Sequence, residues 1–434
     1  MISRQSVCLR RLADGRAQEV KFGRWLANDK VTPEQLLANA YVRTGAAAAG
    51  RHVLAIQDTS ELNYQAHARR VSGLGTVGNG SDVGMFVHPL LAVDAADGAC
   101  LGLAHLHWWI RTQKADPDYQ RLPIEQKESY RWLEVAQAGK QCLSEAAMVT
   151  VVADRESDLY EEWARLPDAR THLLTRACHD RTLAAGGKLY AWLDAQPVQG
   201  HYSFDVPARP GKRSVHQARL SVRFGRVAIK RPKNCSDPHA PKRIELSVIE
   251  VRELPDSVIG NEEPIHWRLM TTHAITCLED ALRCVGWYRQ RWHIEQLFRT
   301  LKKQGLKIES SQLESGKGLS KLACLAVQAA VRILQLTLAR DGGNDAPASH
   351  VFDAQEIKVL QRILPTLEGK TQKQKNPHQP GSLAQAAWVV ARLGGWKGYA
   401  SEAKPGPITM LHGLQRLEAI SLGWDLAAGD VCID

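Results

Sequence analysis

Residues 288–302 read YRQRWHIEQLFRTLK. Four polar residues stand at offsets 0, +3, +7 and +14 of this segment: Tyr288, Arg291, Glu295 and Lys302. At about 100° per residue in an α-helix, these offsets fall within a strip roughly 60° wide on one face. A stripe of apolar side chains beside that strip predicts that the helix packs against a core. One carboxylate would then lie among two cations and a phenol, as expected of a metal-binding acid flanked by phosphate-binding groups.

Two aspartates directly follow apolar runs that are typical of buried strands. Asp58 comes after HVLAIQ at 52–57, and Asp154 comes after AAMVTVVA at 146–153. Side chains at the carboxyl ends of neighbouring strands project into a common crevice. If the 288–302 helix packs across these strand ends, Asp58, Asp154 and Glu295 converge.

Three converging carboxylates would suit two Mg²⁺ ions, with Mn²⁺ able to substitute, because hard divalent cations prefer oxygen ligands. Asp58 would bridge the two metals, Asp154 would hold one, and Glu295 the other. Two metals about 3.5–4 Å apart can stabilise both the attacking and the leaving oxygen of a phosphoryl displacement. The sequence thus predicts phosphoryl-transfer chemistry.

Each of these motifs also has an ordinary structural interpretation. A single aspartate after a strand is commonly a turn or N-cap residue. The DRESD segment at 154–158 could be a charge-paired helix start, and the strip at 288–302 could consist of surface pairs. The order along the chain favours the catalytic interpretation: strand and Asp, hairpin, strand and Asp, β-rich segment, helix and Glu.

Composition sets broad limits on the class of protein. With 434 residues, 44% hydrophobic and 24% charged, the chain can form two or three ordinary globular domains. Its net charge of +10 favours an anionic partner such as nucleic acid. The nine cysteines include no C-x-x-C pair, which argues against a zinc site or a disulfide framework. No signal peptide or membrane span is expected, so we predict a cytoplasmic bacterial protein, associated with the nucleoid when bound to DNA.

The pattern of elements predicts a mixed α/β (α+β) fold. Residues 178–265 contain short alternating segments such as ARLSVRF and IELSVIEV, separated by basic, proline-containing interruptions. These features are typical of a β-rich insertion with exposed loops. Helical patterns follow at 288–302, at about 318–340 and in LAQAAWVVARL near the C-terminus.

Taken together, these motifs resemble those of the DDE transposases of the bacterial insertion-sequence type-four family, the group that includes the transposon-five transposase. AIQDTSELNY at 55–64 is similar to the first-aspartate motif, and VVADRESDLYE at 151–161 to the second. The spacing Y-x2-R-x3-E-x6-K at 288–302 resembles the signature around the catalytic glutamate. GMFVHPLLAV and GLAHLHWWIR resemble the hairpin between the aspartates. The resemblance extends from about residue 20 to residue 425.

The resemblance implies a ribonuclease-H-like catalytic core interrupted by a β-rich insertion, with a helical C-terminal domain. The first aspartate arrives early, so the N-terminal region that reads transposon ends is expected to be shortened. The expected segments are a shortened N-terminal helical region (1–50), the first part of the core (51–177), the β-rich insertion (178–265), the second part of the core with the glutamate helix (266–345) and a C-terminal helical dimerisation region (346–434).

The implied activity is cut-and-paste DNA transposition. A metal-activated water nicks one strand at the transposon end, and the freed 3′-hydroxyl attacks the opposite strand to form a hairpin. The hairpin is reopened, and the same hydroxyl then attacks target DNA. The implied partners are double-stranded DNA, as transposon ends and as target, and a second copy of the chain in a homodimeric synaptic complex.

The resemblance also assigns DNA contacts. Tyr288, Arg291 and Lys302 would hold the phosphate of a flipped base, and Trp267, 21 residues before Tyr288, would stack on that base. A core position on the sheet is the alternative for Trp267. Arg176, at the end of HLLTRA, could approach a phosphate near the active site or form a structural ion pair.

Two other functions remain open from the sequence. One is a shortened, non-catalytic regulator or inhibitor of transposition, which would sequester full-length copies through its C-terminal region. The other is a ribonuclease-H-like nuclease without strand-transfer activity.

Overall fold

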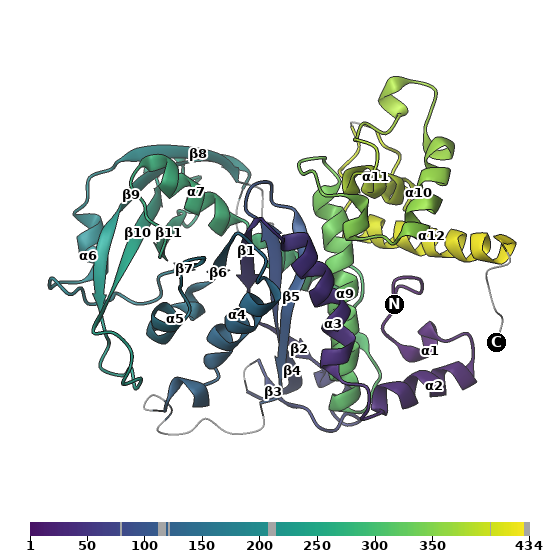
Figure 1. Cartoon of the computed structure of the whole chain (residues 1–434), viewed down its shortest axis with the longest axis horizontal. Helices are drawn as coiled ribbons and strands as arrows, with labels where there is room; N and C mark the ends of the chain where they lie inside the picture. The colour runs from purple at the N-terminus through teal and green to yellow at the C-terminus, as the bar shows by residue number, and fades with distance from the viewer. Residues whose placement is uncertain (79, 112–118, 120–121, 207–213, 400, 429–434) are drawn as a thin grey trace.

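One large β-sheet runs through the protein (Figure 1). The computed structural model describes residues 1–434 except 79, 112–118, 120–121, 207–213, 400 and 429–434. The described strands form an 11-stranded sheet in the order β2-β4-β1-β6-β7-β11-β10-β9-β8, with β3 and β5 also paired to β4. This mixed sheet, with helices packed on it, confirms the predicted α/β class. The strands are β1 His52–Gln57, β2 Ser60–Asn63, β3 Gly75–Val77, β4 Asp82–Asp94, β5 Cys100–Trp109, β6 Met148–Ala153, β7 Thr171–Arg176, β8 Gly200–Val206, β9 His216–Lys230, β10 Arg243–Glu253 and β11 His266–Thr271.

The centre of the sheet aligns the two predicted aspartates. Strand β1 is parallel to β6, and β6 is parallel to β7, whereas β4 is antiparallel to both β1 and β5. Ile56 of β1 lies opposite Val152 of β6. Asp58 and Asp154 each come two residues later, so both follow the strands at the same end of the sheet.

The described strands of residues 178–265 continue the same sheet. Strand β11 pairs antiparallel with β7, bringing Leu269 opposite Arg176. Strands β10, β9 and β8 follow outward, each antiparallel to its neighbour. The β-rich segment therefore widens the sheet that carries the aspartates.

Helices cover the sheet and extend beyond it (Figure 1). Helices α3, α4 and α9 pack on β5, and α10, α11 and α12 lie together on the side of α9 away from the sheet. Among the described residues, α9 is the one helix long and apolar enough to cross a membrane, but 72% of its apolar window is buried, as in a core helix. The helices are α1 Leu9–Leu12, α2 Arg16–Ala27, α3 Pro33–Ala48, α4 Tyr130–Cys142, α5 Tyr160–Arg165, α6 Leu189–Asp194, α7 Leu278–Arg289, α8 Trp292–Lys302, α9 Gly316–Ala339, α10 Ala354–Leu367, α11 Leu383–Leu393 and α12 Pro407–Ala428.

The expectation of one continuous helix over 288–302 is wrong. Helix α7 ends at Arg289, and α8 begins at Trp292 with Arg291 as its N-cap. The junction is wound more tightly than an α-helix, because Arg291 N–H donates to the carbonyl of Tyr288 and Ile294 N–H to that of Arg291, both three residues back. Glu295 and Lys302 still share α8, but Tyr288 belongs to a separate helix.

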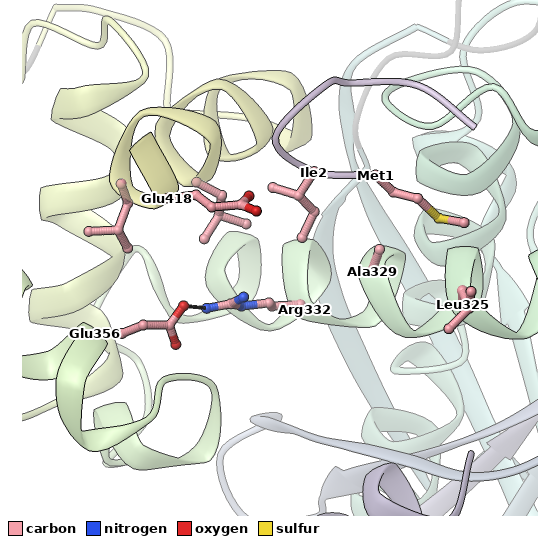
Figure 2. Close-up of a pocket in the computed structure, with 9 residues that line it drawn as sticks. Met1, Ile2, Leu325, Ala329, Arg332, Glu356 and Glu418 are labelled. Carbon is pink, nitrogen blue, oxygen red and sulfur yellow. Dashed lines mark hydrogen bonds and ion pairs between the residues drawn. The ribbon is translucent and has the colours of Figure 1, made fainter. Parts of the chain in front are cut away.

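The first residues of the chain pack against helices α9, α10 and α12. Met1 and Ile2 line a cavity of about 420 Å³ that is also bordered by α9, α10 and α12 (Figure 2). An ion pair of 2.5 Å between Arg332 of α9 and Glu356 of α10 crosses this cavity. The N-terminal segment and the C-terminal helices therefore border one cavity and lie close to each other in the fold.

Candidate active site

Asp58 and Asp154 are held at the strand ends by their own loops. The Oδ1 atom of Asp58 accepts the backbone N–H of Thr59 at 2.8 Å, and Oδ1 of Asp154 accepts that of Arg155 at 2.6 Å. Asp154 begins the short 3₁₀ turn Arg155–Ser157. In each aspartate, Oδ1 accepts this local hydrogen bond and Oδ2 takes no part in it.

Arg291 connects Asp58 to Glu295. Its Nη1 lies 2.9 Å from Oδ2 of Asp58, and its Nη2 lies 2.6 Å from Oε1 of Glu295. The Arg291 side chain is only 14% exposed, so these charge-assisted hydrogen bonds form in a largely desolvated place. Two carboxylates that are 237 residues apart in sequence thus meet on one guanidinium.

Asp154 belongs to the same electrostatic cluster. Burial alone would lower the pKa of Arg291, but the nearby Tyr288, Asp58, Asp154 and Glu295 outweigh burial and raise it. Burial raises the pKa of Asp58 to about 6, and repulsion from Asp154 and Glu295 adds to this rise despite the opposing effect of Arg291. The three carboxylates predicted from sequence therefore lie close enough for their charges to interact.

The chemistry of the site suits a divalent cation, although its present side-chain arrangement does not form a metal cage. Among the residues that the structure describes, no group of three His, Cys, Asp or Glu side chains is placed to hold a metal ion. The Arg291 guanidinium stands between Asp58 and Glu295 instead. The donors are carboxylate oxygens, which Mg²⁺ prefers. Burial is the main cause of the raised pKa of Asp58, and repulsion from Asp154 and Glu295 adds to it, so a bound cation would stabilise the ionised carboxylate.

Tyr288 contacts Trp267 and lies within electrostatic range of Arg176 and Asp154. Tyr288 is 6% exposed, and its ring meets Trp267 edge to face with centroids 5.7 Å apart. Burial raises the pKa of Tyr288 to about 12, Asp154 adds to the rise, and Arg291 and Arg176 oppose it. Arg176 donates from Nη2 to the carbonyl of His266 at 3.0 Å.

Lys302 is held by partners in β2 and in the turn after α8. Its Nζ donates to the carbonyl of Glu61 at 2.9 Å and lies 3.3 Å from Oε1 of Glu309. The predicted phosphate ligands are thus divided: Arg291 is bonded to carboxylates, Tyr288 is buried, and Lys302 is paired beside β2.

A partner of both aspartate loops was missed from the sequence. Arg131 of α4 donates from Nε to Thr59 Oγ1 at 2.9 Å and pairs through Nη2 with Glu156 at 2.8 Å. Thr59 follows Asp58, and Glu156 lies two residues after Asp154. Arg131 therefore joins the two loops directly.

A second connection runs through the interior. Thr59 Oγ1 lies 2.7 Å from His88 Nδ1, and His88 Nε2 lies 3.2 Å from Gln57 Oε1. Gln57 donates to Glu162 at 3.4 Å, and Ser157 donates to the other oxygen of Glu162 at 2.6 Å. Buried polar groups that are hydrogen-bonded in this way hold their segments in one arrangement.

Burial keeps this chain of groups uncharged near neutral pH. It raises the pKa of Glu162 to about 8 and lowers the pKa of His88 well below its usual value. The sequence carried a signal for one of these residues, because His88 interrupts the apolar run MFVHPLLAV, whereas Gln57 ends the run of β1 and Glu162 lies beside Glu161. Polar residues inside apolar runs are rarely left without partners.

Part of the chain matches a known protein family. Residues 136–332 match the family model described as "Transposase DDE domain". The matched region contains Asp154 and Glu295, whereas Asp58 lies before it. The match supports the interpretation of the chain as a DDE transposase.

Among solved structures, the chain is similar to one titled "Cryo-EM structure of piggyBac transposase synaptic complex with hairpin DNA (SNHP)". The identity is 10%, the alignment covers 88% of this chain and 69% of that one, and the TM-score is 0.34. A likeness at this level carries no weight for function.

The raised pKa of Asp58 predicts that its charge opposes folding. The native state binds this proton more tightly than the unfolded chain, so the ionised carboxylate costs stability progressively as the pH rises from about 4 through 6. Replacing Asp58 by Asn should leave the free energy of unfolding nearly unchanged at pH 4 and raise it by about 2 kcal/mol at pH 8. Urea unfolding at the two pH values measures the difference.

Asp168→Asn is the matched control of opposite sign. The hydrogen bond from Lys140 lowers the pKa of Asp168, so its ionised form favours folding, weakly because the group is near the surface. This variant should lose a little stability as the pH rises. An Asp58→Asn protein that behaves in the same direction would contradict the assignment of a crowded, desolvated carboxylate.

Proposed function

We propose that this protein is a DNA transposase of the insertion-sequence type-four family that carries out cut-and-paste transposition by two-metal phosphoryl transfer. The observation that carries the proposal is the meeting of Asp58, Glu295 and Asp154 around Arg291, from three distant parts of the chain. The match of residues 136–332 to a transposase DDE domain supports it independently.

The strand order supports a ribonuclease-H-like core. Strands β5, β4 and β1 form the antiparallel part, and β6 and β7 continue parallel to β1. Asp58 and Asp154 follow the two adjacent parallel strands, and Glu295 reaches them from α8. Such an arrangement lets a sheet hold two acids rigidly while a helix supplies the third.

Asp58, Asp154 and Glu295 are the groups that would hold Mg²⁺ or Mn²⁺. The bound metals would activate the attacking oxygen and stabilise the leaving oxygen. The chain itself supplies the positioning: Arg131 and the buried Gln57–His88–Glu162 connection keep the two aspartate loops in register.

Arg291 has a second part in the proposal. It neutralises Asp58 and Glu295 while it bridges them, and it has to turn from at least one carboxylate toward DNA to bind a phosphate. Trp267 is partly exposed between Tyr288 and Phe204, and its exposed part would stack on an extruded base, which offsets part of the unstacking cost.

We further propose that double-stranded DNA and a second copy of the chain are the partners. The net charge of +10 favours association with DNA. The last turns of α12 carry exposed apolar side chains, with Leu422 58% and Leu426 53% exposed. Exposed apolar groups gathered on one helix are typical of a protein–protein contact.

A strand-transfer assay tests the proposed function. The purified protein, Mg²⁺, a pre-cut DNA end carrying the inverted repeat beside its gene, and a plasmid target should give covalently joined product. Nicking without joining would instead identify a nuclease without strand transfer. A protein that binds these ends but neither nicks nor joins them would favour the regulatory alternative.

A further inference from the structure

A second concave site lies beside the carboxylates, between the core and the β-rich segment. This pocket has a volume of about 480 Å³ and is bordered by α5, by residues 179–182 and by the loop that joins β9 to β10. Its lining includes six cationic side chains and three carboxylates. The cations are Lys127, Arg181, Lys188, Lys230, Arg231 and Lys233.

The β9–β10 loop is anchored against the core. Tyr160 of α5 donates its hydroxyl to the carbonyl of Pro241 at 2.8 Å. Arg165 of α5 pairs with Asp237 at 2.8 Å, and the Asp237 side chain is only 7% exposed. Most residues of this loop are exposed, as expected of an interruption between strands, but Asp237 is buried and docks on α5.

Anchoring fixes cations at the mouth of the pocket. Arg231 donates a hydrogen bond to the carbonyl of Ala240, and Arg181 forms an ion pair with Asp158, so neither cation is free to bind a ligand without losing this partner. Lys230 and Lys233 are both exposed, and no carboxylate within the described part of the chain lies in ion-pair range of either. The Nζ of Lys188 donates to the carbonyl of Asp180 at 3.1 Å. Among the described residues, the ammonium groups of Lys188, Lys230 and Lys233 therefore border one pocket without forming an ion pair, although three carboxylates also line that pocket.

The pocket borders the active site through the end of β7. Asp158, in the loop after Asp154, accepts the backbone N–H groups of Cys178 and His179 at 2.9 and 3.2 Å. His179 lines the pocket. Cys178 lies within electrostatic range of both sites. Burial raises the pKa of its thiol, and the negative charges of Asp158 beside the pocket and Asp154 in the active site raise this pKa further. A polyanion in the active site could thus continue into the pocket past residues 178–179.

We propose that Lys188, Lys230 and Lys233 bind the phosphate backbone of duplex DNA that extends beyond the cleavage site. The inference rests on the proposed function and adds a place for DNA outside the catalytic centre. Phosphate contacts of this kind position a duplex without reading its sequence. Lys230 ends β9, Lys188 precedes α6 and Lys233 lies in the anchored loop, so the backbone positions of all three lysines are fixed before DNA binds.

Binding of a short duplex of generic sequence, in EDTA so that cleavage cannot occur, tests the proposal. The triple variant Lys188→Gln, Lys230→Gln, Lys233→Gln should bind roughly tenfold or more weakly at about 100 mM salt. Its dependence of log Kd on log salt should fall by about 0.9 for each lysine that contacts a phosphate. The matched control is Lys370→Gln, Lys373→Gln, Lys375→Gln, which removes the same charge from exposed positions between α10 and α11.

The possible results distinguish a failure of the pocket proposal from a failure of the proposed transposase function. A control triple that weakens binding as much as the pocket triple would overturn the site, since net charge alone would explain the loss. Unchanged affinity and salt slope in the pocket triple would overturn it too, while a parent protein that still joins DNA ends keeps the transposase proposal. A parent that neither binds nor cuts DNA would remove both.

Discussion

Replacing Asp58, Asp154 or Glu295 by Ala should each lower the rate of Mg²⁺-dependent nicking at transposon-end DNA by about 10³-fold or more. Several kcal/mol of transition-state stabilisation depend on metals in such a site, and each 1.4 kcal/mol corresponds to a factor of ten. Binding of the same DNA in EDTA should change far less, because the carboxylates contribute no attraction to phosphate. Single-turnover nicking and EDTA binding measure the two effects.

Asp256→Ala is the control for this series. Asp256 is an exposed carboxylate whose side chain is 59% accessible and pairs with Arg219 at the surface of the β-rich segment. Its loss should change the nicking rate by less than about twofold. A folded Asp58→Ala or Glu295→Ala protein that nicks at the parent rate would overturn the assignment of the active site.

Arg181→Leu should lower the free energy of unfolding by about 3–5 kcal/mol. Arg181 donates from Nε to Oδ1 of Asp158 at 2.8 Å, and the two side chains are 7% and 0% exposed. Removing the guanidinium leaves a buried carboxylate whose remaining hydrogen bonds, within the described parts of the chain, come from the N–H groups of Cys178, His179 and Trp163. An unpaired buried charge is among the most costly single defects.

Urea unfolding of Arg181→Leu beside Arg219→Leu measures this effect. The Arg219–Asp256 pair is exposed on both sides, so its loss should cost no more than about 1 kcal/mol. Equal losses in the two variants would show that burial of the Arg181–Asp158 pair does not matter. The expected difference follows from solvent screening at the surface and its absence in the interior.

Local sequence was enough to predict the strands that carry the aspartates. HVLAIQ and the end of AAMVTVVA form β1 and β6, because short apolar runs bury both faces of a strand. It also predicted the β-rich character of residues 178–265, where β8, β9 and β10 are found. These features depend on neighbours within a few residues.

The role of Arg291 could not be read in the same way. The helical spacing and the family resemblance predicted a phosphate ligand, but the helix is interrupted between α7 and α8, and the guanidinium reaches Asp58, 233 residues away. A periodic pattern assumes an unbroken helix and contains no information about such a distant partner. Long-range charge pairs arise only when separate elements pack.

The sequence by itself determined the acids, the strands that end at them and the class of chemistry they suit, because these follow from composition and short-range periodicity. Only the tertiary structure decided which groups meet. It joined the aspartate loops through Arg131, His88 and Glu162, and it folded the β9–β10 loop onto α5. Those contacts depend on the order of strands in the sheet, which brings together residues that no local pattern connects.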